Sequence, residues 1–151
     1  MLKVRIIPTL LLKGFGLVKG TQFDSWRRVG PVLPAVKVYN NREVDELIVV
    51  DIAAHETVDD VDYETVEDFT QDCFIPITVG GGIVEVQQVQ KLLYAGADKI
   101  CVNTSSFTSP KLVGQIAKLY GSQSVVASID VKKIGDSWRC FSHAGRKDTG
   151  Y

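Results

Sequence analysis

The stretch PITVGGGIVEVQQVQKLLYAGADKICVNTSS, residues 76–106, places a helical pattern between two short apolar runs. The helical pattern carries one apolar stripe, formed by Val86, Val89, Leu92 and Leu93. This spacing predicts an amphipathic helix over residues 84–94, and the runs beside it predict strands over 75–79 and 99–103. Two strands joined by a helix make the unit of a parallel sheet that is covered by helices.

The same alternation extends over the rest of the chain. Further strands are predicted over residues 4–9, 46–51 and 125–130. Helices are predicted from Pro31 onward, over residues 61–69, and from Pro110 to Tyr120 behind the N-cap Ser109. Most of the predicted strands are continuous apolar runs, which is typical of strands buried on both faces. Repeated units of this kind leave two α/β architectures, an open doubly wound sheet or a (β/α) barrel.

Two other segments carry weaker signals. Residues 131–141 place a turn, Gly135 and Asp136, between two β-rich arms, and this predicts a hairpin after the fifth strand. Residues 14–30 combine glycines with charges of both signs. We interpret them as a mobile active-site loop, or alternatively as a plain surface loop.

The composition is that of one ordinary domain over residues 1–151. Hydrophobic residues make up 45% and charged residues 23% of the chain, a balance that can bury a core. A formal net charge of −1 with interspersed signs argues against nucleic-acid binding. The sequence shows neither an apolar run of about 20 residues nor a signal-peptide pattern, so we expect a cytoplasmic protein. Three widely spaced cysteines predict buried free thiols.

Both architectures place their chemistry at the carboxyl ends of the strands. There, Gly80, Gly81 and Gly82 remove the side chains from a loop that leads into a helix. Backbone N–H groups can then approach an anion such as a phosphate at the positive end of that helix. Asn103 and Thr104 end the next strand and offer further donors. A tight turn without any ligand is the alternative.

Two aspartates, Asp51 and Asp130, end other predicted strands. A buried carboxylate is costly to ionise unless it is paired, so either residue could act as a general acid or base. A structural carboxylate, satisfied by backbone N–H groups or a neighbouring lysine, is the alternative. His55 and His143 lack a spacing typical of metal ligands. We assign them no role and expect neither a metal nor a cofactor.

Several short motifs, taken together, resemble one known family. They are RIIP, VKGT, DEL, TVGGGI, GADK, NT, GSQSVVASID and GRKDTG. Along its whole length the chain resembles the HisF-type cyclase subunit of imidazole glycerol phosphate synthase from histidine biosynthesis. The resemblance implies a (β/α)8 TIM barrel, of which this chain carries about the first five strands and four helices. It also implies a lyase-type reaction, the ammonia-dependent cyclisation and cleavage that yields imidazole glycerol phosphate.

The resemblance implies roles for individual residues. Asp130 matches one of the two acid and base carboxylates, and Lys19 reaches the substrate from the loop after the first strand. Gly82, Asn103 and Thr104 hold one of the two phosphates of the substrate. The residues that we expect to contact the phosphorylated substrate are Lys19, Asp51, Gly82, Asn103 and Thr104.

In this family a HisH-like glutaminase partner releases ammonia, which enters the base of the barrel through a gate. Arg5, Glu46 and Lys99 match three charged residues of that gate. Thr78 matches a residue that lines the ammonia path, and Asp98 matches a position at the glutaminase interface. For the charged residues, a cluster of salt bridges that holds the bottom of the barrel is the alternative.

The sequence departs from the family pattern at one catalytic position. The family's other catalytic aspartate falls on Leu11, which can neither accept nor donate a proton. Losing one member of an acid and base pair typically lowers the rate by orders of magnitude. A related branch from surface-polysaccharide pathways also resembles this segment, and it implies a non-catalytic barrel that delivers ammonia for sugar amidation. A phosphate-binding scaffold and the neighbouring isomerase of the pathway are further alternatives.

A second departure concerns length. The sequence stops at Tyr151, whereas a barrel of this kind needs about 250 residues. A half-barrel leaves its first and fifth strands as open edges. We therefore expect a fragment, or a half-barrel that forms a homodimer or pairs with a complementing half.

Overall fold

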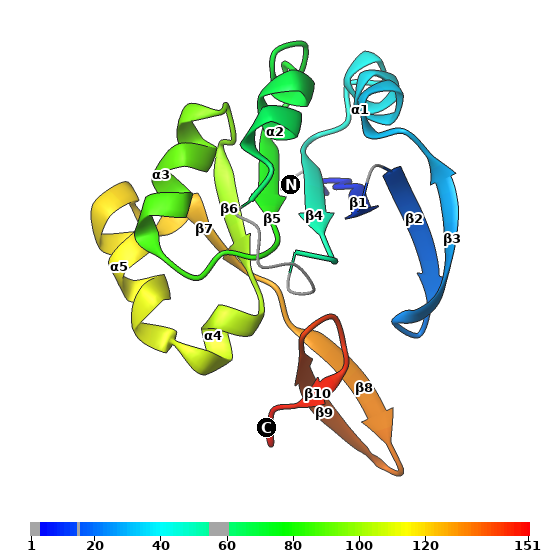
Figure 1. Cartoon of the computed structure of the whole chain (residues 1–151), viewed down its shortest axis with the longest axis vertical. Helices are drawn as coiled ribbons and strands as arrows, with labels where there is room; N and C mark the ends of the chain where they lie inside the picture. Colours follow the sequence, from blue (N-terminus) through cyan, green and yellow to red (C-terminus); the bar gives the residue numbers. More distant parts are fainter. Residues whose placement is uncertain (1–3, 15, 55–60) are drawn as a thin grey trace.

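A computed structural model describes residues 4–14, 16–54 and 61–151 of the chain. Figure 1 shows a curved sheet with helices around its outside and a smaller sheet on its open side. The large sheet has the strand order β3-β2-β1-β4-β5-β6-β7. From β1 to β7 the neighbours are parallel, which confirms the predicted α/β fold. The described part of this sheet is open, because β3 and β7 stand at the two ends of the order.

Strands and helices alternate along the chain. The large sheet consists of β1 (Thr9–Lys13), β2 (Gly16–Thr21), β3 (Asp24–Gly30), β4 (Leu47–Asp51), β5 (Ile77–Gly80), β6 (Lys99–Val102) and β7 (Val125–Ala127). The small sheet consists of β8 (Asp130–Ile134), β9 (Ser137–Ser142) and β10 (Lys147–Asp148). The α-helices are α1 (Val32–Asn41), α2 (Tyr63–Thr70), α3 (Val86–Tyr94), α4 (Thr104–Thr108) and α5 (Pro110–Tyr120), and a short 3-10 helix, η1, covers Ser122–Ser124.

The main core lies between the parallel strands and the helices. Val89 and Leu92 of α3 are fully buried, and Val86 and Leu93 pack beside them, which confirms the predicted apolar stripe. Burying a side chain of this size contributes roughly 1.5–3 kcal/mol. α5 begins as predicted, with Ser109 as N-cap and a proline in its first turn.

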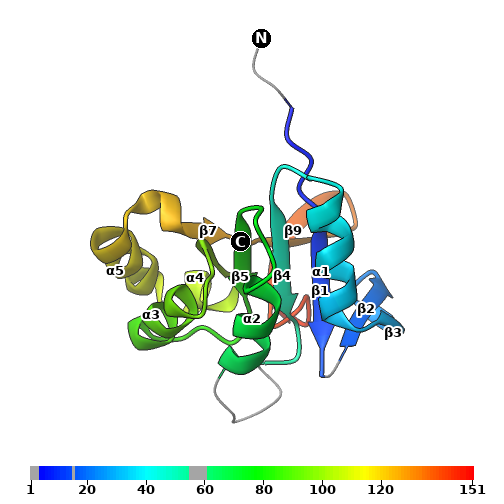
Figure 2. The same cartoon turned by 90° about the horizontal axis from the view of Figure 1, so that it is seen from above.

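The first strand lies later in the sequence than we predicted. The prediction of a strand over residues 4–9 is wrong, because β1 covers Thr9–Lys13. Parallel pairing with β4 explains the shift, since Thr9 pairs with Ile48 and Leu12 with Asp51. Residues 4–8 precede this register as an extended segment that leads to the N-terminus (Figure 2), and the N–H of Ile6 donates to Asp45 at 2.8 Å.

The segment 14–30 is not a plain loop. Its described residues form a β-hairpin in which β2 pairs with both β1 and β3 in antiparallel fashion. The first strand therefore does not have the open edge that we expected, because β2 covers it. Gln22, Phe23 and Ser25 in this hairpin have φ angles of +51°, +65° and +55°. Sequence rules reserve such angles mainly for Gly, Asn and Asp, and this hid the turn.

The carboxyl-terminal part matches its prediction more closely. The expected hairpin over 131–141 is confirmed as β8 and β9, and β10 adds a third strand. The helix after the glycines begins at Val86, two residues later than predicted. α4 was not predicted, because its five residues are too few to show a helical period.

Candidate functional site

A cavity of about 310 Å³ lies at the carboxyl ends of the parallel strands. Residues from β1, β4 and β6 line it, together with the loop after β5 and the segment between β7 and β8. Asp51, Gly82, Asn103, Thr104 and Asp130 all contribute to this lining. The structure therefore brings together five of the residues that the sequence predicts for the site.

Close packing leaves no room for a side chain at any of the three glycines. A Cβ at Gly80 would lie 2.7 Å from the carbonyl oxygen of Cys101, and one at Gly81 would overlap the carbonyl oxygen of Asp51. Gly81 and Gly82 have φ angles of +120° and +65°, which favour glycine. A Cβ at Gly82 would lie 2.8 Å from the Cβ of Ala54. Gly81 and Gly82 both line the cavity, whereas Gly80 does not.

The start of α3 is already capped by the protein. Glu85 is its N-cap and forms a capping box with Gln88. The Oε1 atom of Gln88 accepts hydrogen bonds from the N–H groups of Val84 at 2.8 Å and Glu85 at 3.2 Å. The carboxylate of Glu85 occupies the positive end of this helix. The glycine loop therefore lines the cavity through Gly81 and Gly82, whereas the end of the helix is occupied by its own cap.

Asn103 and Thr104 are fixed in place at the end of β6. The Nδ2 atom of Asn103 donates to the carbonyl oxygen of Ser128 at 3.0 Å. The Oγ1 atom of Thr104 accepts the N–H of His143 at 3.1 Å, so the small sheet contacts the site directly. Both side chains line the cavity. Gly80 of β5 pairs with Cys101 of β6, so the end of β6 lies beside the glycine loop.

The two aspartates reach the cavity from different strands. Asp51 ends β4, and its Oδ1 atom accepts the N–H of Ala53 at 2.8 Å. Asp130 begins β8, and burial raises the pKa of its carboxyl group. The N–H of Gly145 and the charge of Lys132 oppose this rise. Asp130 therefore keeps its proton to a higher pH than an exposed aspartate does, which suits a general acid.

Leu11 lines the same cavity from β1. It lies opposite Val50 in β4 and Val18 in β2, so this wall is apolar. Cys101 also lines the cavity, and burial raises the pKa of its thiol. The ionisable carboxylates of the lining are Asp51 and Asp130.

The predicted gate residues meet at the opposite end of the strands. Glu46 directly precedes β4, and its carboxylate accepts Arg5 at 2.6 Å and Lys99 at 2.5 Å. The hydrogen bond from Lys99 is the largest reason why the pKa of Glu46 lies below its ordinary value. These contacts agree with both interpretations given above, a gate and a structural cluster of salt bridges.

Three other predicted residues lie outside the cavity. Thr78 is buried within β5. Asp98 accepts the N–H of Ile77 at 2.8 Å, so it links the starts of β5 and β6. Lys19 is exposed in β2 opposite Arg27, and it is not part of the cavity lining. Its contact with substrate stays a prediction.

The whole sequence is similar to proteins of histidine biosynthesis. Residues 5–151 match the profile of the family described as "Histidine biosynthesis protein". The chain belongs to this family. It is 43% identical over 138 residues to a Campylobacter jejuni protein named "Putative imidazole glycerol phosphate synthase subunit hisF2", covering 91% of this chain and 55% of that protein. It is 41% identical to the imidazole glycerol phosphate synthase subunits HisF of Chlorobium phaeovibrioides and Chloroherpeton thalassium, covering 100% and 99% of this chain.

The match covers only part of the length of these HisF proteins. The chain spans 60% of the length of the Chlorobium and Chloroherpeton proteins. Membership of the histidine biosynthesis family confirms the HisF-type resemblance and the TIM-barrel fold family that the sequence predicts. The parallel strands described above are the corresponding part of such a barrel.

Some lining residues of this cavity were not named individually by the sequence analysis. Phe23 and Trp26 reach it from the β2–β3 hairpin, and Ala144 reaches it from the turn before β10. Ser128 lines it just after β7. Phe23 and Trp26 fall in the segment 14–30, for which one interpretation was an active-site loop. Ser128 lay inside the strand predicted over 125–130, whereas the observed β7 already ends at Ala127. Ala144 lies in a turn that depends on unusual backbone angles.

Neither a metal cluster nor a membrane helix was found in the described residues. Within residues 4–14, 16–54 and 61–151, no three His, Cys, Asp or Glu side chains are grouped to hold a metal ion. Over the same residues, no helix is long and apolar enough to cross a bilayer. The three cysteines are free thiols, with Cys101 buried and the other two half-buried. His55 lies outside the described residues, and His143 contacts Thr104 through its backbone.

Proposed function

We propose that this chain forms the phosphate-binding part of a HisF-type cyclase subunit, which uses ammonia to form imidazole glycerol phosphate. The observation that carries the proposal is the cavity, in which Gly82, Thr104 and Asp130 lie together in a chain 41% identical over its full length to a HisF subunit. Because the chain spans 60% of that relative, the proposal assigns to it one phosphate site and one catalytic carboxylate.

The phosphate is proposed to lie between the glycine loop and the end of β6. Gly82 carries no side chain there, so a phosphate can approach the backbone closely. Asn103 and Thr104 supply polar groups on the facing side, and their own hydrogen bonds fix their positions. An arrangement that is ordered before binding loses less side-chain entropy when the ligand enters.

Asp130 is proposed as the general acid or base of the reaction. Burial raises the pKa of its carboxyl group, which favours donation of a proton to a leaving group. Asp51 faces the same cavity and is proposed to contact the substrate. Leu11 takes no part in proton transfer. Of the two positions that carry catalytic aspartates in the family, only Asp130 would then supply a carboxylate to the reaction in this chain.

A glutaminase of the HisH type is proposed as the partner, at the opposite end of the strands. The ion cluster of Arg5, Glu46 and Lys99 lies there, and Asp98 is exposed beside it. In this proposal ammonia passes the ion cluster and then Thr78. The buried hydroxyl of Thr78 offers a polar contact inside an otherwise apolar strand.

The test is a calorimetric titration with imidazole glycerol phosphate. We expect binding by the unaltered chain, and a loss of roughly tenfold in affinity for Thr104→Val, because a polar contact to a charged group is removed. Thr104→Ser keeps the hydroxyl and should restore the affinity. Thr108→Val, in the same helix but exposed, is the matched control and should bind like the unaltered chain.

Two results would count against this function. One is the absence of any heat of binding with the unaltered chain. The other is an equal affinity for Thr104→Val and Thr108→Val, which would place the phosphate elsewhere.

Leu11 favours a second candidate function, delivery of ammonia to a separate sugar-amidating enzyme. Its side chain occupies the cavity where the family resemblance places a carboxylate. This candidate predicts that the chain stimulates a HisH-type glutaminase but forms no imidazole glycerol phosphate, even after Leu11→Asp. If Leu11→Asp produced cyclisation, the first function would be favoured. A chain that binds phosphate without stimulating a glutaminase would be a scaffold.

A further inference from the structure

Three consecutive residues at the end of β6 each bind a different neighbouring segment. Asn103 donates to the segment after β7, and Thr104 accepts from the turn of the small sheet. The third residue, Ser105, is buried, and its hydroxyl donates to the carbonyl oxygen of Ile83, directly after the glycine loop. Ser105 therefore joins the end of β6 to the loop that follows β5.

The peptide group between Ile83 and Val84 is held at both of its ends. Ser105 binds its carbonyl oxygen, and its N–H donates to the Oε1 atom of Gln88 at 2.8 Å. Ile83, Gln88 and Ser105 are all buried. A buried carbonyl oxygen that loses its donor is costly. Without the Ser105 hydroxyl, this peptide group is therefore expected to turn or shift.

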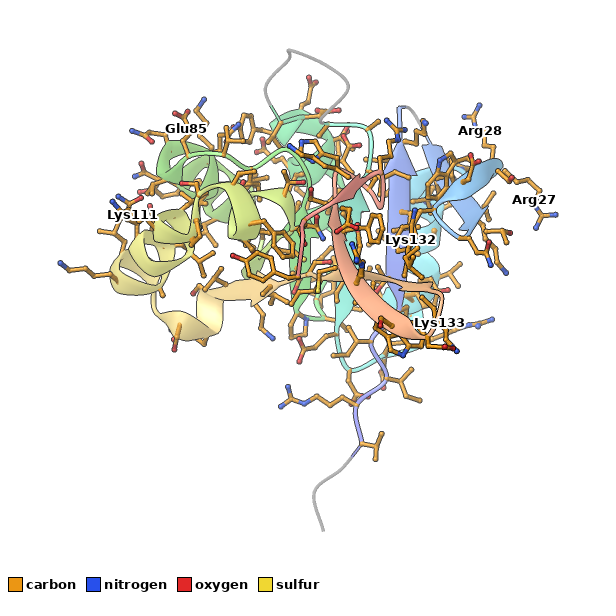
Figure 3. The ribbon with its side chains drawn as sticks, turned by 90° about the horizontal axis from the view of Figure 1, so that it is seen from below. Arg27, Arg28, Glu85, Lys111, Lys132 and Lys133 are labelled. Carbon is orange, nitrogen blue, oxygen red and sulfur yellow. The ribbon has the colours of Figure 1, made fainter. Side chains whose placement is uncertain are left out.

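Gly82 lies one residue before this peptide group, so the Ser105 hydrogen bond also restrains the glycine loop. A Cβ at Gly82 would lie 2.8 Å from the Cβ of Ala54, so Ala54 packs closely against the loop, whereas Ser105 is hydrogen-bonded to its end. Ser105 and Gly82 both line the cavity. Figure 3 shows Glu85, the N-cap of α3, at the periphery of the molecule. The cap thus lies at the surface, whereas the Ser105 hydrogen bond is buried beside the cavity.

We propose that Ser105 is a positioning residue, whose hydrogen bond to Ile83 sets the distance between Gly82 and Thr104 across the cavity. Its hydroxyl is engaged by the backbone, so it acts on a ligand through the glycine loop and not by contact. For its ligand, the inference rests on the proposed function, in which a phosphate lies between these two sides. The hydrogen bond itself belongs to the ligand-free chain, so the two can be tested separately.

Amide hydrogen exchange of the ligand-free chain tests the hydrogen bond. We expect the N–H of Val84 to exchange about fivefold faster in Ser105→Ala, because one of the two bonds that hold its peptide group is lost. The N–H of Leu92, a buried residue in α3, should change less. An equal acceleration at both amides would mean that the substitution only lowers the global stability, and it would overturn the proposal.

Ser106→Ala is the matched control. Ser106 follows Ser105 in α4, but its hydroxyl donates to the carbonyl oxygen of Val102 in β6 at 3.3 Å. Removing this hydroxyl leaves the bond to the glycine loop intact. Ser106→Ala should therefore change neither the exchange of Val84 nor the affinity for a ligand.

A calorimetric titration with imidazole glycerol phosphate tests the consequence for binding. We expect Ser105→Ala to lower the affinity by about three- to tenfold, because the loop is no longer held in its binding position. If Ser105→Ala does not fold, Ser105→Cys takes its place in both measurements. Its sulfur fills nearly the same space but is a weak donor, so we expect changes in the same direction.

The proposal would be overturned if Val84 exchanged at the same rate in Ser105→Ala and in the unaltered chain. It would also be overturned if Ser105→Ala and Ser106→Ala bound the ligand equally well. If the unaltered chain binds no imidazole glycerol phosphate, the proposed function fails, while faster exchange of Val84 in Ser105→Ala still supports Ser105 as the residue that holds the glycine loop.

Discussion

Glu46 is paired with two cationic side chains. Its side chain is 10% exposed and contacts both Lys99 and Arg5. The hydrogen bond from Lys99 lowers its pKa below the ordinary value of 4.5 more than burial raises it. A carboxyl group whose pKa falls on folding stabilises the folded state above its unfolded pKa. That contribution disappears as the pH falls through the folded pKa.

We predict that Glu46→Gln lowers the free energy of unfolding by about 1–3 kcal/mol at pH 7. This change in free energy lies between the values typical of exposed and of buried ion pairs, because Lys99 is partly exposed and Arg5 is largely exposed. Urea unfolding at several pH values should show the gap between the two proteins shrinking below about pH 4.5. A gap that is the same at pH 3 and pH 7 would contradict this assignment.

The pKa of Asp130 shifts in the opposite direction to that of Glu46. Burial raises its pKa above the ordinary value of 3.8, so its contribution to stability is present below that pH and is lost as the pH rises through the folded pKa. Asp130→Asn should therefore raise the free energy of unfolding by about 1 kcal/mol at pH 7, as removal of a destabilised site residue often does. Asp136→Asn, in the exposed β8–β9 turn, is the control. A loss of stability in Asp130→Asn alone would show that the carboxylate is structural.

At the scale of the element, two glycines in contrasting surroundings should respond oppositely to alanine. Gly114 lies inside α5 with no atom within 4 Å of a Cβ, so Gly114→Ala should stabilise the protein by about 0.5–1 kcal/mol. Gly81→Ala should destabilise it by about 2–3 kcal/mol, because its φ is +120° and its Cβ would overlap Asp51. Thermal unfolding of both variants checks this. A destabilised Gly114→Ala would mean that α5 is packed differently.

The parallel strands and their helices could be predicted because their apolar runs are continuous. The predicted ranges for β4 and β6 begin or end within one residue of the observed strands. β1 was misplaced, because its position depends on register with β4, and a sequence does not carry register in its local pattern. The β2–β3 hairpin was missed because Gln22 and Phe23 adopt angles for which the sequence gives no warning.

The residues of the site likewise fall into those that the local sequence pattern predicts and those that it does not. Asp51, Asn103 and Asp130 could be found, since each stands where a predicted strand ends. Phe23 and Ala144 could not, because two hairpins bring them to the cavity through contacts between distant parts of the chain. Local pattern thus identifies the groups on the strands, whereas tertiary packing supplies the groups that cover them.

At the scale of the whole molecule, the described sheet has an unpaired edge at β7. β7 pairs with β6 and stands at the end of the strand order. Ile129, two residues after β7, exposes 54% of its surface. Apolar surface beside an unpaired edge favours association. We predict that the chain sediments as a homodimer at micromolar concentration in analytical ultracentrifugation, and a monodisperse monomer would contradict this.

The measurement that tests the phosphate-site assignment most directly is a two-dimensional NMR titration of the ¹⁵N-labelled chain with imidazole glycerol phosphate. The account predicts that the largest shifts occur at the amides of Gly82, Asn103 and Thr104, with smaller shifts at Ala144. Amides at the opposite end, such as those of Glu46 and Lys99, should move little. Shifts that centre on that opposite end, or no shifts at all, would contradict the placement of the ligand in this cavity.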